Sequence, residues 1–263
     1  MLGAVIGDIV GSVYEWHNIK TKDFPLFRGD CFFTDDTVMT VATADALMNG
    51  GTNGDFIDAY KKWGRMYPNA GYGGRFGSWL NSDDRRAYNS WGNGSAMRVS
   101  PCGWFAASLA ECREKASASA AVTHSHPEGV KGALAVTDAI FICRTSPASC
   151  KDEIRERVTK EYGYDLSRTL DKIRPTYVFN ESCQETVPQA ITAFLESTDF
   201  EDAIRCAISL GGDSDTLAAI TGSIAEAAYG VPAWIEEKAW SYLTEPLREV
   251  CRRWREYTAQ DIS

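Results

Sequence analysis

The chain has 263 residues, of which 44% are hydrophobic and 24% charged, and its formal net charge is -9. This apolar content is sufficient for a packed core, while the acidic balance argues against nucleic acid as the main partner, because a phosphate backbone requires basic patches. No apolar run approaches membrane-spanning length, and the first residues lack a basic region and a cleavage signature, so we expect a cytoplasmic protein with no membrane partner.

The first predicted helix covers residues 2–13 and carries Gly3, Gly7 and Gly11 on one face. Glycines at this spacing allow another helix to approach closely, and they match neither the dinucleotide-binding fingerprint nor the P-loop. Glu15 follows among aromatic residues. On the sequence alone it is either a site carboxylate or a solvated surface residue.

The next predicted helix begins at Thr34-Asp35-Asp36-Thr37. Thr and Asp are preferred helix caps, and acids in a first turn interact well with the helix dipole. Four consecutive oxygen-bearing side chains exceed what a cap uses, and adjacent carboxylates repel each other unless a cation lies between them. Taken alone, this stretch fits a helix cap and a metal site equally well.

Residues 69–94 are rich in glycine, asparagine, serine and aromatic residues. A loop of this length in a compact domain is usually a binding loop. It leads into Asn93-Gly94-Ser95, directly before an expected helix. Backbone amides exposed at a helix N-terminus form a cradle for phosphate groups.

A further helix is predicted from Pro101 through Ala110, followed by a run of small residues that ends at Thr123-His124-Ser125-His126. A His-x-His pair can bind zinc, but no cysteine or third histidine accompanies it. Substrate contact or helix capping is therefore the better interpretation of His124 and His126.

The remainder of the chain is also predicted to be helical, except for the short strand-like segment Thr176–Phe179. Expected helices cover residues 128–143, 149–158, 186–195, 200–209, 217–228, 232–243 and 245–257. No alternation of strands and helices, no repeat and no linker is found. We therefore predict an all-α fold in one domain of residues 1–263.

A second acidic cluster, Asp213-Ser214-Asp215-Thr216, precedes another apolar helix near the end of the chain. Together with the first cluster it offers only oxygen ligands, which select hard divalent ions such as Mg²⁺ or Mn²⁺ over zinc or copper. Two ions bridged by one carboxylate would use this many acids well. The repeated pattern predicts one shared metal site, assembled when the fold brings the two clusters together.

Two other classes of helical metal protein do not match. Isoprenoid synthases carry Asp-Asp-x-x-Asp/Glu, whereas Asp35-Asp36 is followed by Thr37-Val38-Met39. Di-iron bundles require Glu-x-x-His on facing helices, and the sequence contains none.

Five motifs, in this order along the chain, resemble those of the ADP-ribosylglycohydrolase family. They are Gly7-Asp8…Gly11-Ser12…Glu15, Phe33-Thr34-Asp35-Asp36-Thr37, Gly92-Asn93-Gly94-Ser95-Ala96-Met97-Arg98, Thr123-His124 and Gly211-Gly212-Asp213-Ser214-Asp215-Thr216. The resemblance implies a compact single-domain orthogonal helical bundle with a dinuclear Mg²⁺ or Mn²⁺ centre. That agrees with the interpretation of the acidic clusters.

Residue by residue, the resemblance implies a set of ligands and substrate contacts. One metal ion would be bound by Thr34, Asp35, Asp36 and Asp215, and the second by Asp213, Asp215 and Thr216, with Asp215 bridging. Glu15 matches an acid on a mobile loop, Gly94 and Ser95 match a turn that cradles the diphosphate, and His124 matches a histidine that lines the ADP-ribose cleft.

The implied reaction is hydrolysis of the bond between C1 of ADP-ribose and a side chain of an ADP-ribosylated protein, with Glu15 or Asp35 as the catalytic proton acceptor. Members of the family release ADP-ribose from arginine, serine, polymers or small metabolites. Tyr14-Glu15-Trp16 resembles the subset with a Glu-bearing flap, and this resemblance favours O-linked substrates. The alternatives are a non-catalytic ADP-ribose binder or structural relative, and a hydrolase of a small ADP-ribosyl metabolite. We expect a monomer.

Overall fold

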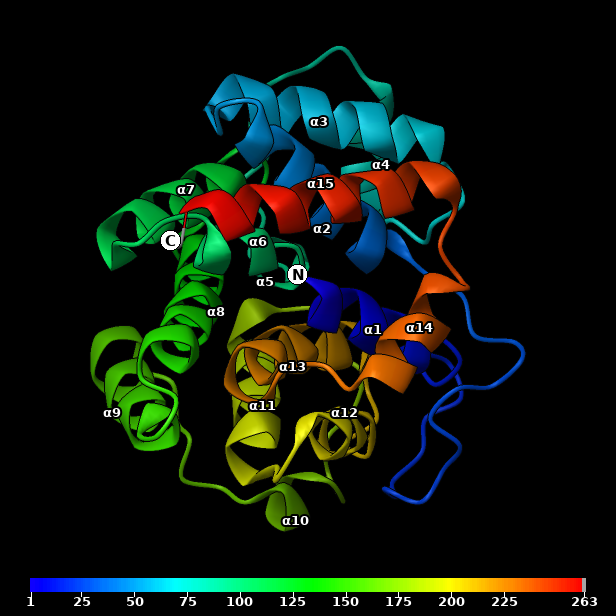
Figure 1. Cartoon of the computed structure of the whole chain (residues 1–263), viewed down its shortest axis with the longest axis vertical. Helices are drawn as coiled ribbons and strands as arrows, with labels where there is room; N and C mark the ends of the chain where they lie inside the picture. Colours follow the sequence, from blue (N-terminus) through cyan, green and yellow to red (C-terminus); the bar gives the residue numbers. More distant parts are fainter. Residues whose placement is uncertain (262–263) are drawn as a thin grey trace.

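Two helices from opposite ends of the chain, α1 (Leu2–Gly11) and α13 (Ser214–Tyr229), pack against each other at the centre of the computed structural model, which describes residues 1–261 (Figure 1). The approach is so close that a Cβ atom at Gly7 would lie 2.0 Å from the carbonyl oxygen of Ala218. One at Gly3 would lie 2.1 Å from the oxygen of Gly222. The interpretation of the glycine face as a packing surface is confirmed.

Fifteen helices and no strand are found in residues 1–261, so the all-α prediction is confirmed. The other helices are α2 (Asp35–Met48), α3 (Asn53–Met66), α4 (Gly74–Asn81), α5 (Gly94–Met97), α6 (Ser100–Trp104), α7 (Leu109–Ala121), α8 (Pro127–Thr145), α9 (Cys150–Tyr162), α10 (Leu170–Ile173), α11 (Cys183–Glu196), α12 (Phe200–Ile208), α14 (Ala233–Trp240) and α15 (Glu245–Asp261).

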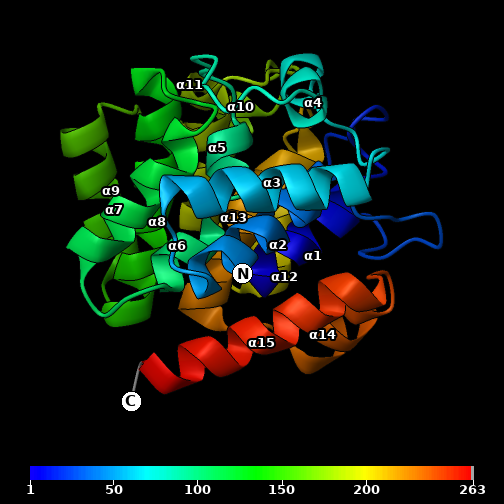
Figure 2. The ribbon, with the colours of Figure 1, turned by 90° about the horizontal axis from the view of Figure 1, so that it is seen from above.

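These helices surround the central pair in several directions. Helix α2 contacts α1, α3, α6 and α15, while α11 and α12 pack on α13. Helix α8 contacts α13 and carries α6, α7 and α9 on its other sides. Figure 1 shows α15 running across the view and α8 running down it, and Figure 2 shows α2 between α3 and α15. The buried apolar side chains form one continuous cluster. No helix in residues 1–261 is both long and apolar enough to cross a bilayer.

Three local expectations were wrong. Thr176–Phe179 is a loop, because no strand lies beside it; its Tyr177 carbonyl accepts a hydrogen bond from Lys20 Nζ instead (2.7 Å). The helix expected from Pro101 through Ala110 breaks after Trp104, since Ser108 caps the new helix α7 by accepting from the amide of Glu111. Residues 69–94 contain the short helix α4. The domain was predicted to span residues 1–263. Its last two residues, 262–263, lie outside the described residues.

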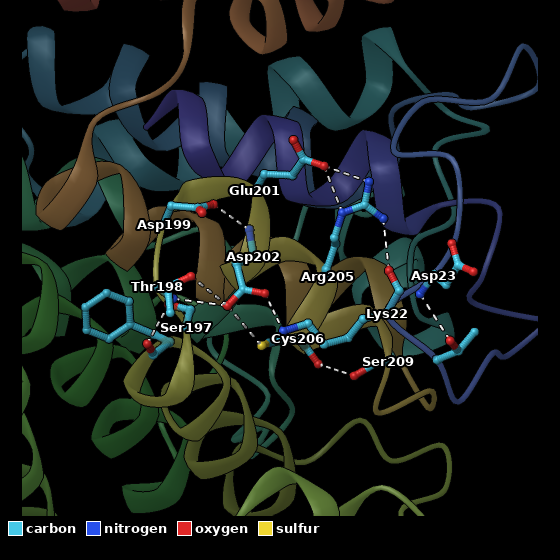
Figure 3. A network of polar contacts seen from close by, with 12 residues as sticks. Lys22, Asp23, Ser197, Thr198, Asp199, Glu201, Asp202, Arg205, Cys206 and Ser209 are labelled. Carbon is cyan, nitrogen blue, oxygen red and sulfur yellow. Dashed lines mark hydrogen bonds and ion pairs between the residues drawn. The ribbon is translucent and has the colours of Figure 1, made fainter.

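The loop that follows α1 is fastened to α12 by a polar network (Figure 3). Arg205 Nη1 donates to the carbonyl oxygens of Lys22 (3.0 Å) and Phe24 (2.6 Å), and its Nε donates to Glu201 (2.8 Å). Lys22 also forms an ion pair with Asp202. These contacts fix the far part of a loop whose first residues include Glu15.

Candidate active site

The N-termini of α2 and α13 meet at a cavity of about 390 Å³. Thr216 Oγ1 on α13 donates to Asp36 Oδ2 on α2 across 3.1 Å, although the two residues are 180 positions apart in the chain. The expectation that the fold brings the two acidic clusters together is thereby confirmed. The cavity is lined by Glu15, Thr34, Asp35, Asp36, Gly94, His124, Asp213, Asp215 and Thr216, and also by Trp16, Phe32, Arg75, Tyr88, Asn93, Arg98 and Glu181, among others.

The N-terminus of α2 is organised around Asp8, a fully buried acid on α1. Asp8 Oδ2 accepts hydrogen bonds from the backbone amides of Thr34 (2.9 Å) and Thr37 (3.0 Å), and Oδ1 accepts from Thr34 Oγ1 (2.7 Å). Thr34 is the helix cap, and its Oγ1 also accepts from the amide of Asp36 (3.3 Å). Asp8 therefore holds the first acidic motif in place.

The N-terminus of α13 is reached through two glycines with positive φ, Gly211 (+67°) and Gly212 (+74°), a conformation that other residues rarely adopt. Asn18 fixes this turn: its Oδ1 accepts from the amide of Gly212 (2.7 Å) and its Nδ2 donates to the carbonyl of Gly212 (2.9 Å). Asn18 Nδ2 also donates to the carbonyl of Glu15 (2.8 Å). One side chain thus ties the Glu15 loop to the second acidic motif.

Carboxylates gather here into two overlapping groups, Asp8 with Asp36 and Asp215, and Glu15 with Asp213 and Asp215. Within each group one ligand oxygen per residue lies within 4.8 Å of the others. Asp215 belongs to both groups. Asp36 Oδ1 is buried and has no hydrogen-bond partner among the described residues. An oxygen-only donor set with an unsatisfied buried oxygen fits a divalent cation.

The electrostatics of the cluster agree with that fit. Burial raises the pKa of Asp8 to about 6, and burial together with Asp213 raises the pKa of Glu15 to about 7. Burial and neighbouring carboxylates raise the pKa values of Asp36 and Asp215 well above their usual range. Negative charges that disfavour one another this strongly need a positive charge among them to ionise together.

Asp35 lies beside these groups and belongs to neither of them. It is half-buried and faces the cavity, and burial and the charge of Asp8 raise its pKa well above the usual range. The 69–74 segment passes close by, since a Cβ atom at Gly71 would lie 3.5 Å from Asp35 Oδ1. Asp35 is thus exposed to a bound molecule.

Gly94, Ser95 and His124 are also close together, but they face different ways. A Cβ atom at Gly94 would lie 3.0 Å from His124 Nε2, so the imidazole sits directly over this turn. The side chain of Ser95 is buried and donates to the carbonyl of Gly129 on α8 (2.7 Å). Ser95 therefore anchors the turn through its hydroxyl, while Gly94 and His124 line the cavity.

Sequence reasoning missed several residues that the structure brings to this site. Asp8 was given no role of its own, although an acid on an otherwise apolar helix is itself a signal. Asn93 Nδ2 donates to Asp213 Oδ2 (2.7 Å), which links the glycine turn to the acidic cluster. Glu181 and Arg98 line the cavity from segments that carry no metal-ligand pattern.

Comparison with known proteins identifies the fold and the relatives of this chain. The sequence model described as ADP-ribosylglycohydrolase matches residues 1–262. The chain belongs to the ADP-ribosylglycohydrolase family. The resemblance inferred from the five ordered motifs is confirmed.

Individual ADP-ribosylglycohydrolase relatives are similar to this chain over most of its length. ADP-ribosylarginine hydrolase Tri1 of Pseudomonas putida is 28% identical over 290 residues, covering 95% of this chain and 76% of its own. ADP-ribosylhydrolase ARH3 of Mus musculus is 26% identical over 307 residues, covering 88% and 83%. A solved structure titled ADP-ribosylglycohydrolase-related protein complex has a TM-score of 0.73 at 22% identity and covers 98% of this chain and 95% of its own, which establishes the shared fold.

Proposed function

We propose that this protein is a metal-dependent hydrolase that cleaves the glycosidic bond between ADP-ribose and an acceptor side chain, serine or arginine, and so reverses mono-ADP-ribosylation. The observation that carries the proposal is the concentration of buried, mutually repelling carboxylates in a cleft. Acids with strongly perturbed pKa values in a cleft are typical of functional sites. The names of the relatives, one an ADP-ribosylarginine hydrolase, support the substrate class.

The cofactors we propose are two divalent cations, Mg²⁺ or Mn²⁺. The ligands would come from Thr34, Asp35, Asp36, Asp213, Asp215 and Thr216. Asp8 orients Thr34, and Glu15 lies beside Asp213 and Asp215. When bound, such cations neutralise the carboxylates, bind ribose hydroxyls and polarise a water molecule.

The protein's own residues would supply the remaining chemistry. Cleavage at C1 of the ribose passes through a positively charged, oxocarbenium-like state, which carboxylates at the cleft stabilise. Glu15 lines the cleft and carries a carboxylate that can accept a proton at the reacting centre. Asp35 is the alternative acceptor. The exposed Arg75 and the buried Arg98 and His124 line the same cleft, where they favour a diphosphate.

The proposal is tested by removing single acids. Asp35→Ala and Asp213→Ala should each lower the release of ADP-ribose at least about 100-fold, since each takes an oxygen donor from the site. The matched control is Asp152→Ala, an exposed first-turn acid of α9 that leaves the cleft unchanged. Undiminished release of ADP-ribose by either cleft variant would contradict the proposed function.

The substrate is resolved by assaying arginine-linked and serine-linked conjugates and small ADP-ribosyl metabolites in parallel, with Mg²⁺ or Mn²⁺ and with EDTA. Turnover of one conjugate that EDTA abolishes supports the proposed reaction and names the acceptor. Turnover of a small metabolite alone supports that alternative. Calorimetric binding of ADP-ribose without turnover of any conjugate would instead identify a non-catalytic binder.

A further inference from the structure

Arg98 is a cation inside the protein. It is 1% exposed and forms no ion pair with an acid among the side chains that the structure describes. Its Nη2 donates to the carbonyl of Ser119 (2.9 Å) and to Thr123 Oγ1 (2.8 Å), and its guanidinium carbon lies 4.3 Å from the centre of the Tyr60 ring. Phe76 flanks it at 5.6 Å. Hydrogen bonds and aromatic faces therefore fix this charge in place.

Thr123 connects Arg98 to His124 through its hydroxyl group. A guanidinium can only donate hydrogen bonds, so Thr123 Oγ1 must accept from it and keeps its own proton for another partner. His124 Nδ1 lies 2.8 Å from the same oxygen. With Arg98 donating to its oxygen, Thr123 has one proton left to donate, and Nδ1 lies within hydrogen-bond distance of it.

His124 is a buried ring whose surroundings favour the neutral form with a single N–H. Burial, followed by the charges of Arg98 and Arg75, lowers its pKa well below the usual value. If Nδ1 accepts from Thr123, the proton of the ring is on Nε2. Nε2 faces the glycine turn, since added Cβ atoms at Gly94 and Gly92 would lie 3.0 and 3.6 Å from it. It has no hydrogen-bond partner within residues 1–259.

We propose that Thr123 and Arg98 are positioning residues that hold His124 as the neutral tautomer with its proton on Nε2. The ring is then a hydrogen-bond donor into the cleft over the Gly92–Gly94 turn, and it takes an oxygen acceptor of the ligand, a phosphate or a hydroxyl. A neutral donor keeps the same direction at every pH at which the protein is folded and the ring stays uncharged. Arg98 provides the positive charge that the imidazole does not carry.

The tautomer can be observed directly by ¹⁵N-detected nuclear magnetic resonance of the histidine rings in the whole chain. The protein has three histidines, His17, His124 and His126, so the His124 signals are assigned by their loss in His124→Gln. We expect Nδ1 to appear unprotonated and Nε2 protonated, with both signals unchanged between about pH 5.5 and 8. A proton on Nδ1, or a ring that titrates near pH 6.5, would overturn the proposal.

Three variants separate positioning from packing. Thr123→Val removes the hydroxyl at nearly constant shape, and we expect mixed tautomers and a roughly tenfold loss of ADP-ribose affinity in Mg²⁺, the loss of about one hydrogen bond. Thr123→Ser should restore both readouts. Thr137→Val is the matched control, because Thr137 on α8 is equally buried and its Oγ1 has no described partner. An unchanged tautomer in Thr123→Val would refute the relay.

The resonance measurement does not depend on the proposed function, whereas the affinity measurement rests on it. The predicted tautomer in a protein that hydrolyses no conjugate would overturn the proposed function and leave the positioning role intact. The opposite result, turnover with a proton on Nδ1, would overturn only the positioning role. If Thr123→Val fails to fold, the wild-type resonances and the Thr123→Ser variant decide the matter.

Discussion

At the scale of single residues, Asp8 is the side chain on which the first acidic motif depends, because it accepts from both ends of the Thr34–Thr37 turn. Asp8→Asn should lower Mn²⁺ affinity about 10–100-fold, as the loss of a residue that orients metal ligands typically does. Without metal, at about pH 7.5, we expect thermal stability no lower than that of the wild type, because the substitution removes one of several repelling charges. Titration calorimetry and thermal melts in EDTA measure the two effects.

The control for this prediction is Asp45→Asn on α2. Asp45 is also a buried acid, but among the described side chains it belongs to no cluster of carboxylates. It accepts hydrogen bonds from Lys62 Nζ at 3.0 Å and from Trp63 Nε1 at 2.8 Å. Its substitution should lower stability without changing Mn²⁺ affinity, which is the reverse of the Asp8→Asn pattern. Wild-type Mn²⁺ affinity in Asp8→Asn would contradict the role assigned to Asp8.

The sequence could predict which residues form the acidic clusters, but not which of them cap a helix and which are available to bind a ligand. Thr34 was open between a cap and a ligand, and the structure shows the cap directly, through its bond to the amide of Asp36. The unsatisfied Asp36 Oδ1 then supplies an argument for a cation that no sequence pattern contains. Ser95 and Gly94 are adjacent in the chain, yet only the structure shows that the Ser95 hydroxyl points to α8. Side-chain direction depends on neighbours remote in the sequence.

At the scale of helices, the contact of α1 with α13 sets the spacing between Asp8 and Asp215. Gly7→Ala would place a Cβ atom 2.0 Å from the backbone oxygen of Ala218, where no side-chain movement can relieve the clash. The two helices must separate, and we expect a loss of about 3 kcal/mol or more in the free energy of unfolding, with weakened metal binding. Denaturant titration and Mn²⁺ calorimetry test both consequences.

The matched control for the helix contact is Gly54→Ala on α3, where the nearest atom to the added Cβ, Thr52 Oγ1, is 3.6 Å away. Here the same substitution should be neutral or stabilise the protein by up to about 1 kcal/mol, since alanine has the higher helix propensity. If Gly7→Ala is as benign as Gly54→Ala, the close contact of α1 with α13 is not what holds the site together.

The same scale shows where pattern reasoning succeeds and where it fails. Gly3, Gly7 and Gly11 predicted a close helix contact because their spacing matches the helical period, a local property. The partner, α13, could not be predicted, because nothing in the first helix specifies a segment so remote in the chain. The break between α6 and α7 was missed because Phe105 and Leu109 continue the apolar period while Ser108 starts a new helix. A cap inside a periodic stretch is easily overlooked.

At the scale of the whole molecule, the acidic clusters join the two ends of the chain, and their charge state should govern its stability. The pKa of Asp8 is about 6 and that of Glu15 about 7 in the folded protein, against ordinary values of 3.8 and 4.5. Between about pH 4 and 7 the folded state therefore binds more protons than the unfolded state. In EDTA, the stability that these protonated acids contribute is present at low pH and is lost as the pH rises through their folded pKa values. Asp8 should dominate this loss, because solvent screens the partly exposed Glu15.

A divalent cation should reverse this loss, because it binds the deprotonated carboxylates of the folded chain. We expect the rise in melting temperature on adding Mg²⁺ or Mn²⁺ to be small at pH 5 and to grow steadily to pH 8. The lowered pKa of His124 has the opposite effect on stability, because it destabilises the folded protein below about pH 6.5. This effect is present with and without metal, so it cancels when the melting temperature without metal is subtracted from that with metal. Differential scanning calorimetry at matched ionic strength gives that difference. A rise in melting temperature that is constant with pH, or largest at pH 5, would show that the cation does not bind the buried acids that link α2 to α13.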